Sequence, residues 1–332
     1  MKLDFDPKSN ITAFENVAMQ LKRISSRIDD LLVVRSIVKN WYDVFLFRVC
    51  MKKAGFVMQL RNGKNIKINK PEDYFSFWET KEAQEEFIKQ SNLHNKIKIA
   101  ENNGLLKFKF KNKIVRLVYD TDKQMNNTLG AIKDQFIGEQ YKWLKVKGKI
   151  VIDIGANIGD SAIYFALKGA RQVHAFEPYP YSYNIANKNI RLNDLQDKIN
   201  LINQGCGGKE REIKIKSSYE NFGGTDLKAF KSGKDIEITT LNEIIKKFNI
   251  EYPAVLKIDC EGCEYGFLLK ANDSDLQKFE QMQIEYHYGY LNLKNKIEHA
   301  GFKVTNTPPK YGYNLKAQNR EMYVGMIYAV IK

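Results

Sequence analysis

The stretch from Lys149 to Asp160 constrains the fold of this chain most strongly. It consists of a short apolar run, a turn containing Gly155 and Gly159, and a segment typical of a helix. The glycines permit a tight turn and let a ligand approach the backbone, while the following helix presents its N-terminal amides to the ligand's polar groups. The spacing is not Gly-x-Gly-x-x-Gly, and no Gly-Lys-Ser/Thr follows, so a P-loop is excluded and a plain dinucleotide site is disfavoured.

An acidic residue follows the next strand-like run at a distance that indicates a ribose contact. Glu177 lies 22 residues after Gly155 and directly before Pro178. A carboxylate at the end of the second strand can accept hydrogen bonds from both ribose hydroxyls. The alternative is a surface glutamate before a helix that starts at the proline. The third strand ends at Gln204 and Gly205, where we expect the adenine edge of a nucleoside.

From residue 149 onward, strand-like and helix-like segments alternate along the chain. This alternation predicts an α/β domain with a mostly parallel, doubly wound sheet. The final run follows a long polar loop rather than a helix, which favours an antiparallel last strand, the arrangement of S-adenosylmethionine (SAM)-dependent methyltransferases. The expected strands cover 149–154, 172–176, 199–203, 254–258, 280–286, 302–305 and 322–331. The expected helices cover 158–168, 181–192, 240–248, 262–270 and 291–300, and an insertion at 205–238 contains a strand-like 212–216 and a flexible 222–226.

Three carboxylates and a histidine follow the fourth and fifth strands: Asp259, Glu261, Glu285 and His287. Ligands of open α/β sheets bind beyond the carboxyl ends of the central strands, so these side chains are the predicted catalytic group. Binding of Mg²⁺ by the three carboxylates is the less favoured alternative. Zinc binding by Cys260 and Cys263 is disfavoured, because no second pair lies nearby and strand alternation would direct Cys260 into the sheet layer.

Together these motifs resemble the FkbM family of SAM-dependent methyltransferases over residues 136–306. The most specific part is Asp259-Cys-Glu-Gly-Cys-Glu264, in which Cys263 replaces a small residue common in the family. The resemblance implies a Rossmann-like class I methyltransferase sheet of seven strands, and O-methylation of sugar, glycan, glycolipid or other natural-product hydroxyls. From the motifs and the resemblance, the predicted SAM-binding residues are Asp153, Gly155, Ala156, Asn157, Gly159, Asp160, Glu177, Pro178, Gln204, Gly205 and Asp259.

An alcohol must lose a proton when it attacks the methyl group, which calls for a base. We expect His287 or Asp259 in this role, with Glu285 orienting His287. A nucleic-acid methyltransferase is a disfavoured alternative, because the double carboxylate would repel phosphates and Asp-Cys-Glu-Gly replaces the Asp/Asn-Pro-Pro-Tyr of base-amine methyltransferases. A SAM-binding module without catalysis is the third hypothesis.

The first part of the chain is basic, and its sequence matches no motif as specific as those above. Residues 1–148 contain 28 Lys and Arg against 17 Asp and Glu, whereas residues 149–332 contain 25 against 22. We expect an α+β region over 1–135, with helices in 11–55 and 72–91, a hairpin around Asn62-Gly63 and an antiparallel pair over 105–119, followed by a methyltransferase domain over 136–332. The charge is consistent with a solvated surface or with peripheral contact to anionic membrane.

Four cysteines, no signal peptide and no apolar run of about 20 residues predict a soluble cytoplasmic protein with reduced cysteines. No oligomeric state is predicted.

Overall fold

A computed structural model describes most of the chain, in two compact units. Unit 1 comprises Met1–Val17 and Glu139–Lys332, and unit 2 comprises Ala18–Gly138. The predicted boundary lay at residue 135, and the structure differs mainly in assigning the first 17 residues to unit 1. The described residues are 5–12, 15, 34, 35, 37–48, 52–70, 73, 74, 77, 80, 83, 99–215, 233–314 and 320–332.

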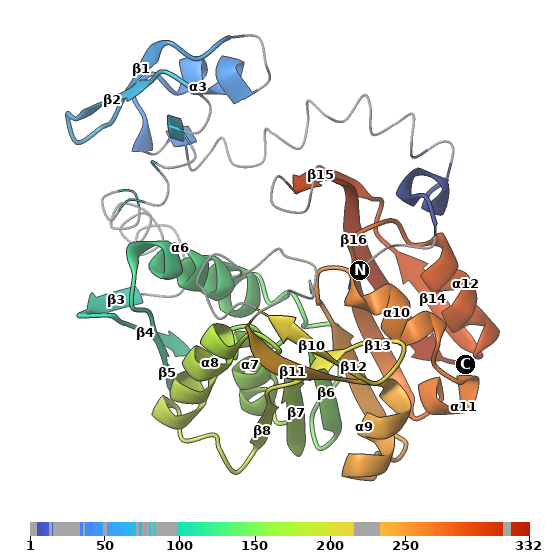
Figure 1. Cartoon of the computed structure of the whole chain (residues 1–332). Coiled ribbons are helices and arrows are strands. Elements are labelled where there is room, and N and C mark those ends of the chain that lie inside the picture. Colours follow the sequence, from blue (N-terminus) through green and yellow to red (C-terminus); the bar gives the residue numbers. More distant parts are fainter. Residues whose placement is uncertain are drawn as a thin grey trace. The chain divides into compact units, whose positions relative to one another are not determined.

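The core of unit 1 is a mixed sheet with the order β14-β16-β13-β12-β6-β7-β8 (Figure 1). Neighbouring strands from β13 to β8 are parallel, whereas β16 runs antiparallel to both β13 and β14. The predicted α/β sheet with an antiparallel last strand is therefore confirmed. Its strands are β6 (Ile150–Ile154), β7 (Gln172–Phe176), β8 (Ile199–Ile202), β12 (Ala254–Ile258), β13 (Phe279–Tyr286), β14 (Phe302–Asn306) and β16 (Arg320–Ile331).

Helices connect the parallel strands as the alternation of the sequence predicts. Pro180 begins α8 at a position where its missing amide hydrogen is not needed, and the Thr240 hydroxyl caps α9 by accepting from the Glu243 amide at 3.3 Å. A short helix, α11, was not predicted. The helices are α7 (Asp160–Leu167), α8 (Pro180–Leu192), α9 (Leu241–Phe248), α10 (Cys263–Leu269), α11 (Asp273–Leu276) and α12 (Leu291–His299).

The central strands are buried along their whole length, and one ion pair lies between them. All five residues of β12 are buried, including Lys257. In the register of the sheet, Lys257 is the neighbour of Asp153 on β6, and its ammonium nitrogen lies 2.9 Å from Asp153 Oδ1. A buried charge is costly unless it is paired, so each of these two residues compensates the charge of the other.

The insertion after β8 forms a small separate sheet. Strands β9 (Gly205–Cys206), β10 (Arg211–Ile215) and β11 (Lys234–Thr239) pair in the order β10-β11-β9. Their isoleucines form an apolar cluster against which Tyr179 packs. The strand predicted at 212–216 is confirmed as β10, and the segment predicted to be flexible, 222–226, lies outside the described residues. The long polar loop before β16 also contains a strand, β15 (Lys310–Asn314), which pairs with β16.

The N-terminal segment belongs to unit 1 because Asn10 is bonded to it. Asn10 ends the short 3-10 helix η1 (Pro7–Asn10) and is buried. Its amide nitrogen donates to the Tyr288 carbonyl and to Asn292 Oδ1, both at 3.0 Å, and its Oδ1 accepts from the Asn292 amide at 2.8 Å. Such a fully bonded buried amide fixes the segment in place.

Unit 2 contains a hairpin, a three-stranded antiparallel sheet and helices, of which the structure describes α3, α6 and η3 in full. The hairpin predicted around Asn62-Gly63 is confirmed, and its Met58 and Ile68 side chains are buried in an apolar cluster. The antiparallel pair predicted over 105–119 is also confirmed. The elements are α3 (Trp41–Arg48), β1 (Phe56–Gln59), β2 (Asn65–Ile68), β3 (Ile99–Asn102), β4 (Leu105–Phe110), β5 (Lys113–Val118), α6 (Asp122–Ala131) and η3 (Ile132–Ile137). Most of the other positions predicted to be helical in 11–55 and 72–91 lie outside the described residues.

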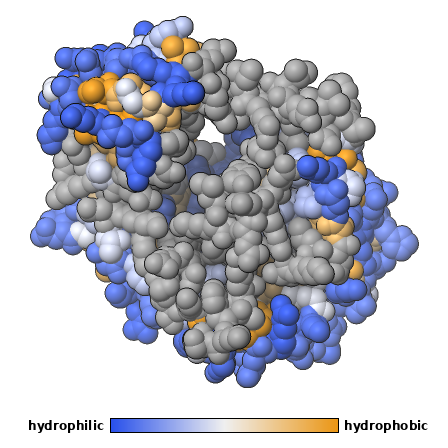
Figure 2. Space-filling view, turned by 45° about the horizontal axis from the view of Figure 1, so that its top comes forward, coloured by the Kyte–Doolittle hydropathy of each residue, from blue (hydrophilic) through white to orange (hydrophobic). Residues whose placement is uncertain are grey.

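On the face shown in Figure 2, the described surface is mainly hydrophilic, with small separate hydrophobic areas. Tyr42, Val57 and Ile114 are among the large apolar side chains exposed in unit 2. Within the described ranges, no helix combines the length and the apolar character that crossing a membrane requires.

Candidate functional site

The candidate site lies where four strands of the sheet end. Gly155 follows β6, Glu177 follows β7, Asp259 follows β12 and His287 follows β13. The register pairs Ile154 with both Phe176 and Ile258, so the first three ends lie at one level. Parallel strands bring their carboxyl ends to the same edge of a sheet, which explains why residues more than 100 positions apart meet here.

The glycine turn closely approaches the loop after β12. Gly155 has a φ of +80°, and a Cβ atom at this position would lie 1.8 Å from the Asp259 carbonyl oxygen. Two steps on, Asn157 also has a positive φ, and its amide donates to Glu177 Oε2 at 2.8 Å. Gly159, with φ +83°, is the N-cap of α7. The turn therefore needs a residue without a side chain at position 155.

Two of the predicted SAM-binding carboxylates are buried beneath the turn. Asp153 pairs with Lys257 and accepts from the Ser161 hydroxyl at 2.7 Å. Lys257 also donates to the Gly155 carbonyl at 2.7 Å, so the ion pair holds the turn from below. Burial raises the pKa of Asp160 to about 7, although the nearby Lys257 ammonium opposes this shift. Neither carboxylate lines the pocket described next.

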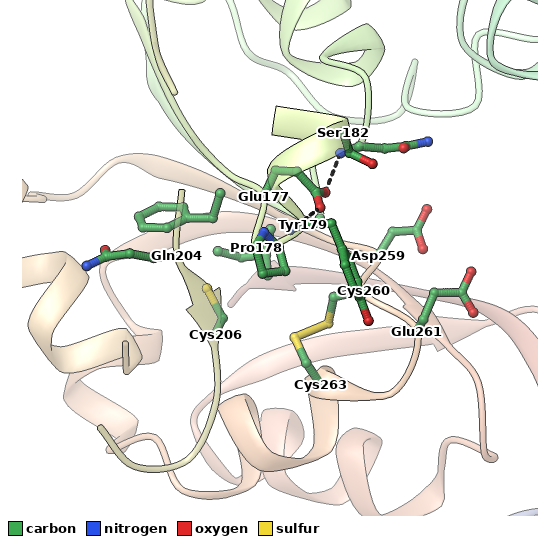
Figure 3. Close-up of a pocket in the computed structure, with 14 residues that line it drawn as sticks. Glu177, Pro178, Tyr179, Ser182, Gln204, Cys206, Asp259, Cys260, Glu261 and Cys263 are labelled. Carbon is green, nitrogen blue, oxygen red and sulfur yellow. Dashed lines mark hydrogen bonds between the residues drawn. A yellow bond between two sulfur atoms is a disulfide. The ribbon is translucent and has the colours of Figure 1, made fainter. Parts of the chain in front are cut away.

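A pocket opens between the ends of β6, β7 and β12 (Figure 3). Several residues predicted from the sequence line it: Gly155, Asn157, Glu177, Pro178, Gln204, Asp259 and Glu261. Others predicted for the site do not: Asp153, Ala156, Gly159, Asp160, Gly205, Glu285 and His287. The lining also includes residues that the sequence reasoning did not select: Ile154, Phe176, Tyr179, Ser182, Cys206, Cys260 and Cys263.

Glu177 lies in the pocket with its carboxylate held by backbone amides. Oε2 accepts from the Asn157 amide at 2.8 Å and Oε1 accepts from the Tyr179 amide at 2.9 Å. Burial raises the pKa of Glu177 to about 7, against the opposing effect of these two amide bonds. A carboxylate has about four acceptor positions, so each oxygen can still accept one hydroxyl. The geometry thus suits a vicinal diol such as a ribose.

The loop after β12 contains a disulfide that the sequence reasoning did not foresee. Cys260 and Cys263 are bonded, with their Cα atoms 5.5 Å apart. The prediction that Cys260 points into the sheet layer is wrong, because β12 ends at Ile258 and strand alternation no longer applies. Positive φ values at Glu261 and Gly262 form a tight turn that brings the two cysteines together. The expectation of reduced cysteines is contradicted for this pair, whereas Cys206 is free and Cys50 lies outside the described residues.

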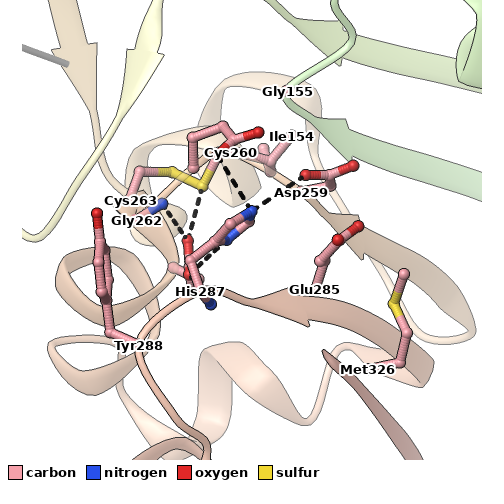
Figure 4. A network of polar contacts seen from close by, with 12 residues as sticks. Ile154, Gly155, Asp259, Cys260, Gly262, Cys263, Glu285, His287, Tyr288 and Met326 are labelled. Atoms are coloured by element: carbon pink, nitrogen blue, oxygen red, sulfur yellow. Dashed lines mark hydrogen bonds and ion pairs between the residues drawn. A yellow bond between two sulfur atoms is a disulfide. The ribbon is translucent and has the colours of Figure 1, made fainter. Parts of the chain in front are cut away.

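The predicted catalytic histidine is oriented by Glu264, and not by Glu285 as predicted. Figure 4 shows His287 with a dashed line from its ring to Asp259. The His287 ring is buried, and its Nδ1 lies 3.0 Å from Glu264 Oε1. Glu264 also accepts from the backbone amides of His287 at 3.1 Å and Gly262 at 2.9 Å. It therefore ties the loop after β12 to the end of β13. Glu285 belongs to β13 itself and does not contact the His287 ring through a hydrogen bond that orients it. Its Oε2 instead accepts from the Gln140 side chain at 3.4 Å.

The other ring nitrogen of His287 faces two carboxylates. Nε2 lies 3.4 Å from Glu261 Oε2 and 3.9 Å from Asp259 Oδ1. The second oxygen of Asp259 accepts from the Tyr141 hydroxyl at 3.3 Å. Tyr141 was not predicted for the site, and no signal in the sequence links it to a residue 118 positions away.

Electrostatics in this cluster favour protonated forms. Burial alone would disfavour a charged His287, but the carboxylates of Glu261, Glu264 and Glu285 outweigh it and raise the pKa of His287 well above its ordinary value. Burial, together with the charge of Asp259, raises the pKa of Glu285 to about 8. The neighbouring carboxylates therefore favour the protonated form of His287.

The strand order, the glycine turn after β6 and the acidic residue after β7 together define a class I SAM-dependent methyltransferase domain. Comparison with known proteins agrees with this class. Residues 153–304 match the model of the methyltransferase FkbM domain. The resemblance found in the sequence is confirmed.

Individual relatives cover the chain only in part. A ribosomal protein L11 methyltransferase from Carboxydothermus hydrogenoformans is 42% identical over 55 residues, which are 17% of this chain and 18% of the relative. The hexuronic acid methyltransferase AglP from Haloferax volcanii is 26% identical over 144 residues, which are 42% of this chain and 56% of the relative. Among solved structures, M. jannaschii TYW2 in complex with AdoMet aligns with a TM-score of 0.33 and 14% identity, over 70% of this chain and 89% of that one.

Proposed function

We propose that this protein is a SAM-dependent O-methyltransferase that modifies a hydroxyl of a sugar, glycan, glycolipid or other natural product. One observation carries the proposal. A buried acidic residue suited to a ribose, Glu177, and two of the predicted catalytic carboxylates, Asp259 and Glu261, line one pocket at aligned strand ends of the FkbM domain.

The residues of the pocket suit the cofactor. Gly155 has no side chain, so a ligand in the pocket can approach its backbone. Glu177 retains acceptor positions for two hydroxyls. Phe176 and Tyr179 add aromatic side chains to the lining, which suits a flat base. When bound, SAM supplies a methyl group that is already activated, so the protein mainly has to align the acceptor. Such positioning contributes roughly 7–11 kcal/mol of barrier reduction.

Asp259 is the proposed proton acceptor. It lines the pocket, its side chain is 29% exposed, and it lies beside the glycine turn. Nε2 of His287 lies 3.9 Å from Asp259 Oδ1, so the histidine is placed to orient this carboxylate. A general base in this position contributes about 10²–10⁴-fold to the rate. AglP is described as a hexuronic acid methyltransferase, so sugar acids and neutral sugars are the first acceptors to test.

Calorimetric titration with SAM tests the first half of the proposal. Glu177→Gln should weaken SAM binding strongly, because the amide cannot accept from two hydroxyls in the same way. Glu280→Gln is the matched control, since Glu280 pairs with Lys149 at 2.7 Å near the opposite, amino ends of the strands. Equal affinities for the two variants, or no binding of SAM at all, would contradict the cofactor assignment.

Methyl transfer to a panel of hydroxylated glycans, followed by mass spectrometry, tests the second half. Asp259→Asn should lower turnover by about 10²-fold or more at saturating SAM, a condition that is needed because Asp259 also lines the pocket. SAM binding without turnover on any acceptor would favour a SAM-binding module without catalysis.

A further inference from the structure

We propose that Asp259, Glu261 and His287 together bind a divalent cation of the Mn²⁺ or Zn²⁺ kind. The inference concerns cation binding alone and does not depend on methyl transfer. It goes beyond the SAM pocket, because His287 belongs to the end of β13 and not to the lining of that pocket.

The three side chains place one ligand atom each around a common point. His287 Nε2, Asp259 Oδ1 and Glu261 Oε2 are contact atoms of this group, and one ligand atom from each residue lies within 4.8 Å of the others. Two ligands about 2.1 Å from one ion lie about 3.0 Å apart at a right angle and about 3.4 Å apart at the tetrahedral angle. The observed 3.4 Å between Nε2 and Oε2 matches the tetrahedral value, and the 3.9 Å between Nε2 and Oδ1 corresponds to a wider angle.

The orientation of His287 is that of a metal ligand. Glu264 is fully buried, and as a carboxylate it can only accept, so Nδ1 of His287 must be the donor. In a neutral ring, the lone pair of Nε2 then points at two carboxylates, which is repulsive unless a proton or a cation lies between them. A ligating histidine that donates its other nitrogen to a carboxylate is the usual arrangement at protein metal sites.

The distances from His287 Nε2 to the two carboxylates fit a bound metal ion better than a shared proton. Hydrogen bonds from a ring nitrogen to a carboxylate are about 2.7–3.2 Å long, and both observed distances exceed that range. His287 is only 3% exposed, so its Nε2 depends on Asp259 and Glu261, or on a cation held between them, to satisfy it.

The chemistry of the ligands indicates which cation fits. One imidazole and two carboxylates suit Mn²⁺, Fe²⁺ or Zn²⁺ better than Mg²⁺, which prefers oxygen alone. Mg²⁺ binding by Asp259, Glu261 and Glu285 was the less favoured alternative from the sequence, whereas the cation proposed here has His287 as its third ligand. Asp259 and Glu261 also line the SAM pocket, so a cation held by them would lie beside it.

Electron paramagnetic resonance with Mn²⁺ tests the proposal on the full-length protein after treatment with a chelator. We expect one Mn²⁺ per chain. Binding should be lost in Glu261→Gln and His287→Gln, and Glu264→Gln should weaken it about 10–100-fold, as is usual when the partner of a ligating histidine is removed. Circular dichroism of every variant shows whether the protein remains folded, and SAM titration of the wild-type protein tests the proposed cofactor separately from the cation.

Two controls separate coordination from general attraction by negative charge. Glu285→Gln removes a neighbouring carboxylate that is outside the ligand set and should change Mn²⁺ affinity far less than Glu261→Gln does. The double variant Cys260→Ser with Cys263→Ser should retain Mn²⁺ binding, because the disulfide sulfurs are not ligands. Absence of Mn²⁺ and Zn²⁺ binding in the wild-type protein, or equal losses in Glu285→Gln and Glu261→Gln, would overturn the proposal.

Discussion

The buried ion pair between Asp153 and Lys257 allows a quantitative prediction for Asp153→Asn. The two side chains are 0% and 2% exposed, and Lys257 also donates to the Gly155 carbonyl. Asparagine keeps the shape of aspartate but leaves the Lys257 ammonium without a counter-charge. Removing one partner of a buried pair costs about 3–5 kcal/mol. That loss is a large share of the total stability of about 5–15 kcal/mol that is typical of a folded domain.

The assay is urea unfolding of unit 1, followed by the fluorescence of Trp143. This residue packs against Tyr328 in the same unit, and Trp41→Phe with Trp78→Phe removes the other two tryptophans. In this background, Asp153→Asn should lower the unfolding midpoint by an amount equivalent to about 3–5 kcal/mol.

Two comparisons isolate the buried charge as the cause. Asp153→Leu combined with Lys257→Met removes both charges and should cost less than Asp153→Asn alone. Lys214→Gln breaks an exposed pair with Asp235 and should cost no more than about 1 kcal/mol. A loss below about 1 kcal/mol for Asp153→Asn, or a double variant as unstable as the single one, would refute the reasoning.

Three further predictions concern the pocket. Gly155→Ala should lower the melting temperature and weaken SAM binding at least tenfold, because the new Cβ would lie 1.8 Å from the Asp259 carbonyl oxygen. Gly148→Ala is the control for backbone strain alone, because Gly148 also has a positive φ (+75°) but a Cβ added there would meet no atom within 4 Å. Because the pKa of Glu177 is about 7 and ribose hydroxyls bind the ionised form, calorimetry should show SAM affinity falling as the pH drops below that value, and Glu177→Gln should remove this dependence. Peptide mapping should find Cys260 and Cys263 protected from iodoacetamide until a reductant is added.

The positions of the site residues could be predicted wherever they depend on the sheet. Gly155, Glu177 and Asp259 each directly follow a buried strand, and period and composition reveal such strands in a single sequence. Once the strands are parallel and adjacent, their carboxyl ends must meet. The same logic correctly predicted the antiparallel β16, because no helix precedes it.

The interactions that depend on loop geometry could not be predicted. Whether Glu264 or Glu285 orients His287 depends on a turn with two positive φ values, which places Glu264 behind the ring. The same turn brings Cys260 and Cys263 together. Neither alternation nor helical period describes a residue in a turn of this kind, so the sequence pattern gives no direction for its side chain.

The position of Asn10 has a consequence for how the chain folds as it is synthesised. Its partners Tyr288 and Asn292 are separated from it by 278 and 282 residues. Unit 2 is continuous in sequence and can assemble once residue 138 has emerged, whereas unit 1 must wait for residues close to the end of the chain. Contacts between residues so far apart in sequence form late and slowly. The segment around Asn10 is thus synthesised before unit 2 but reaches its final place after it.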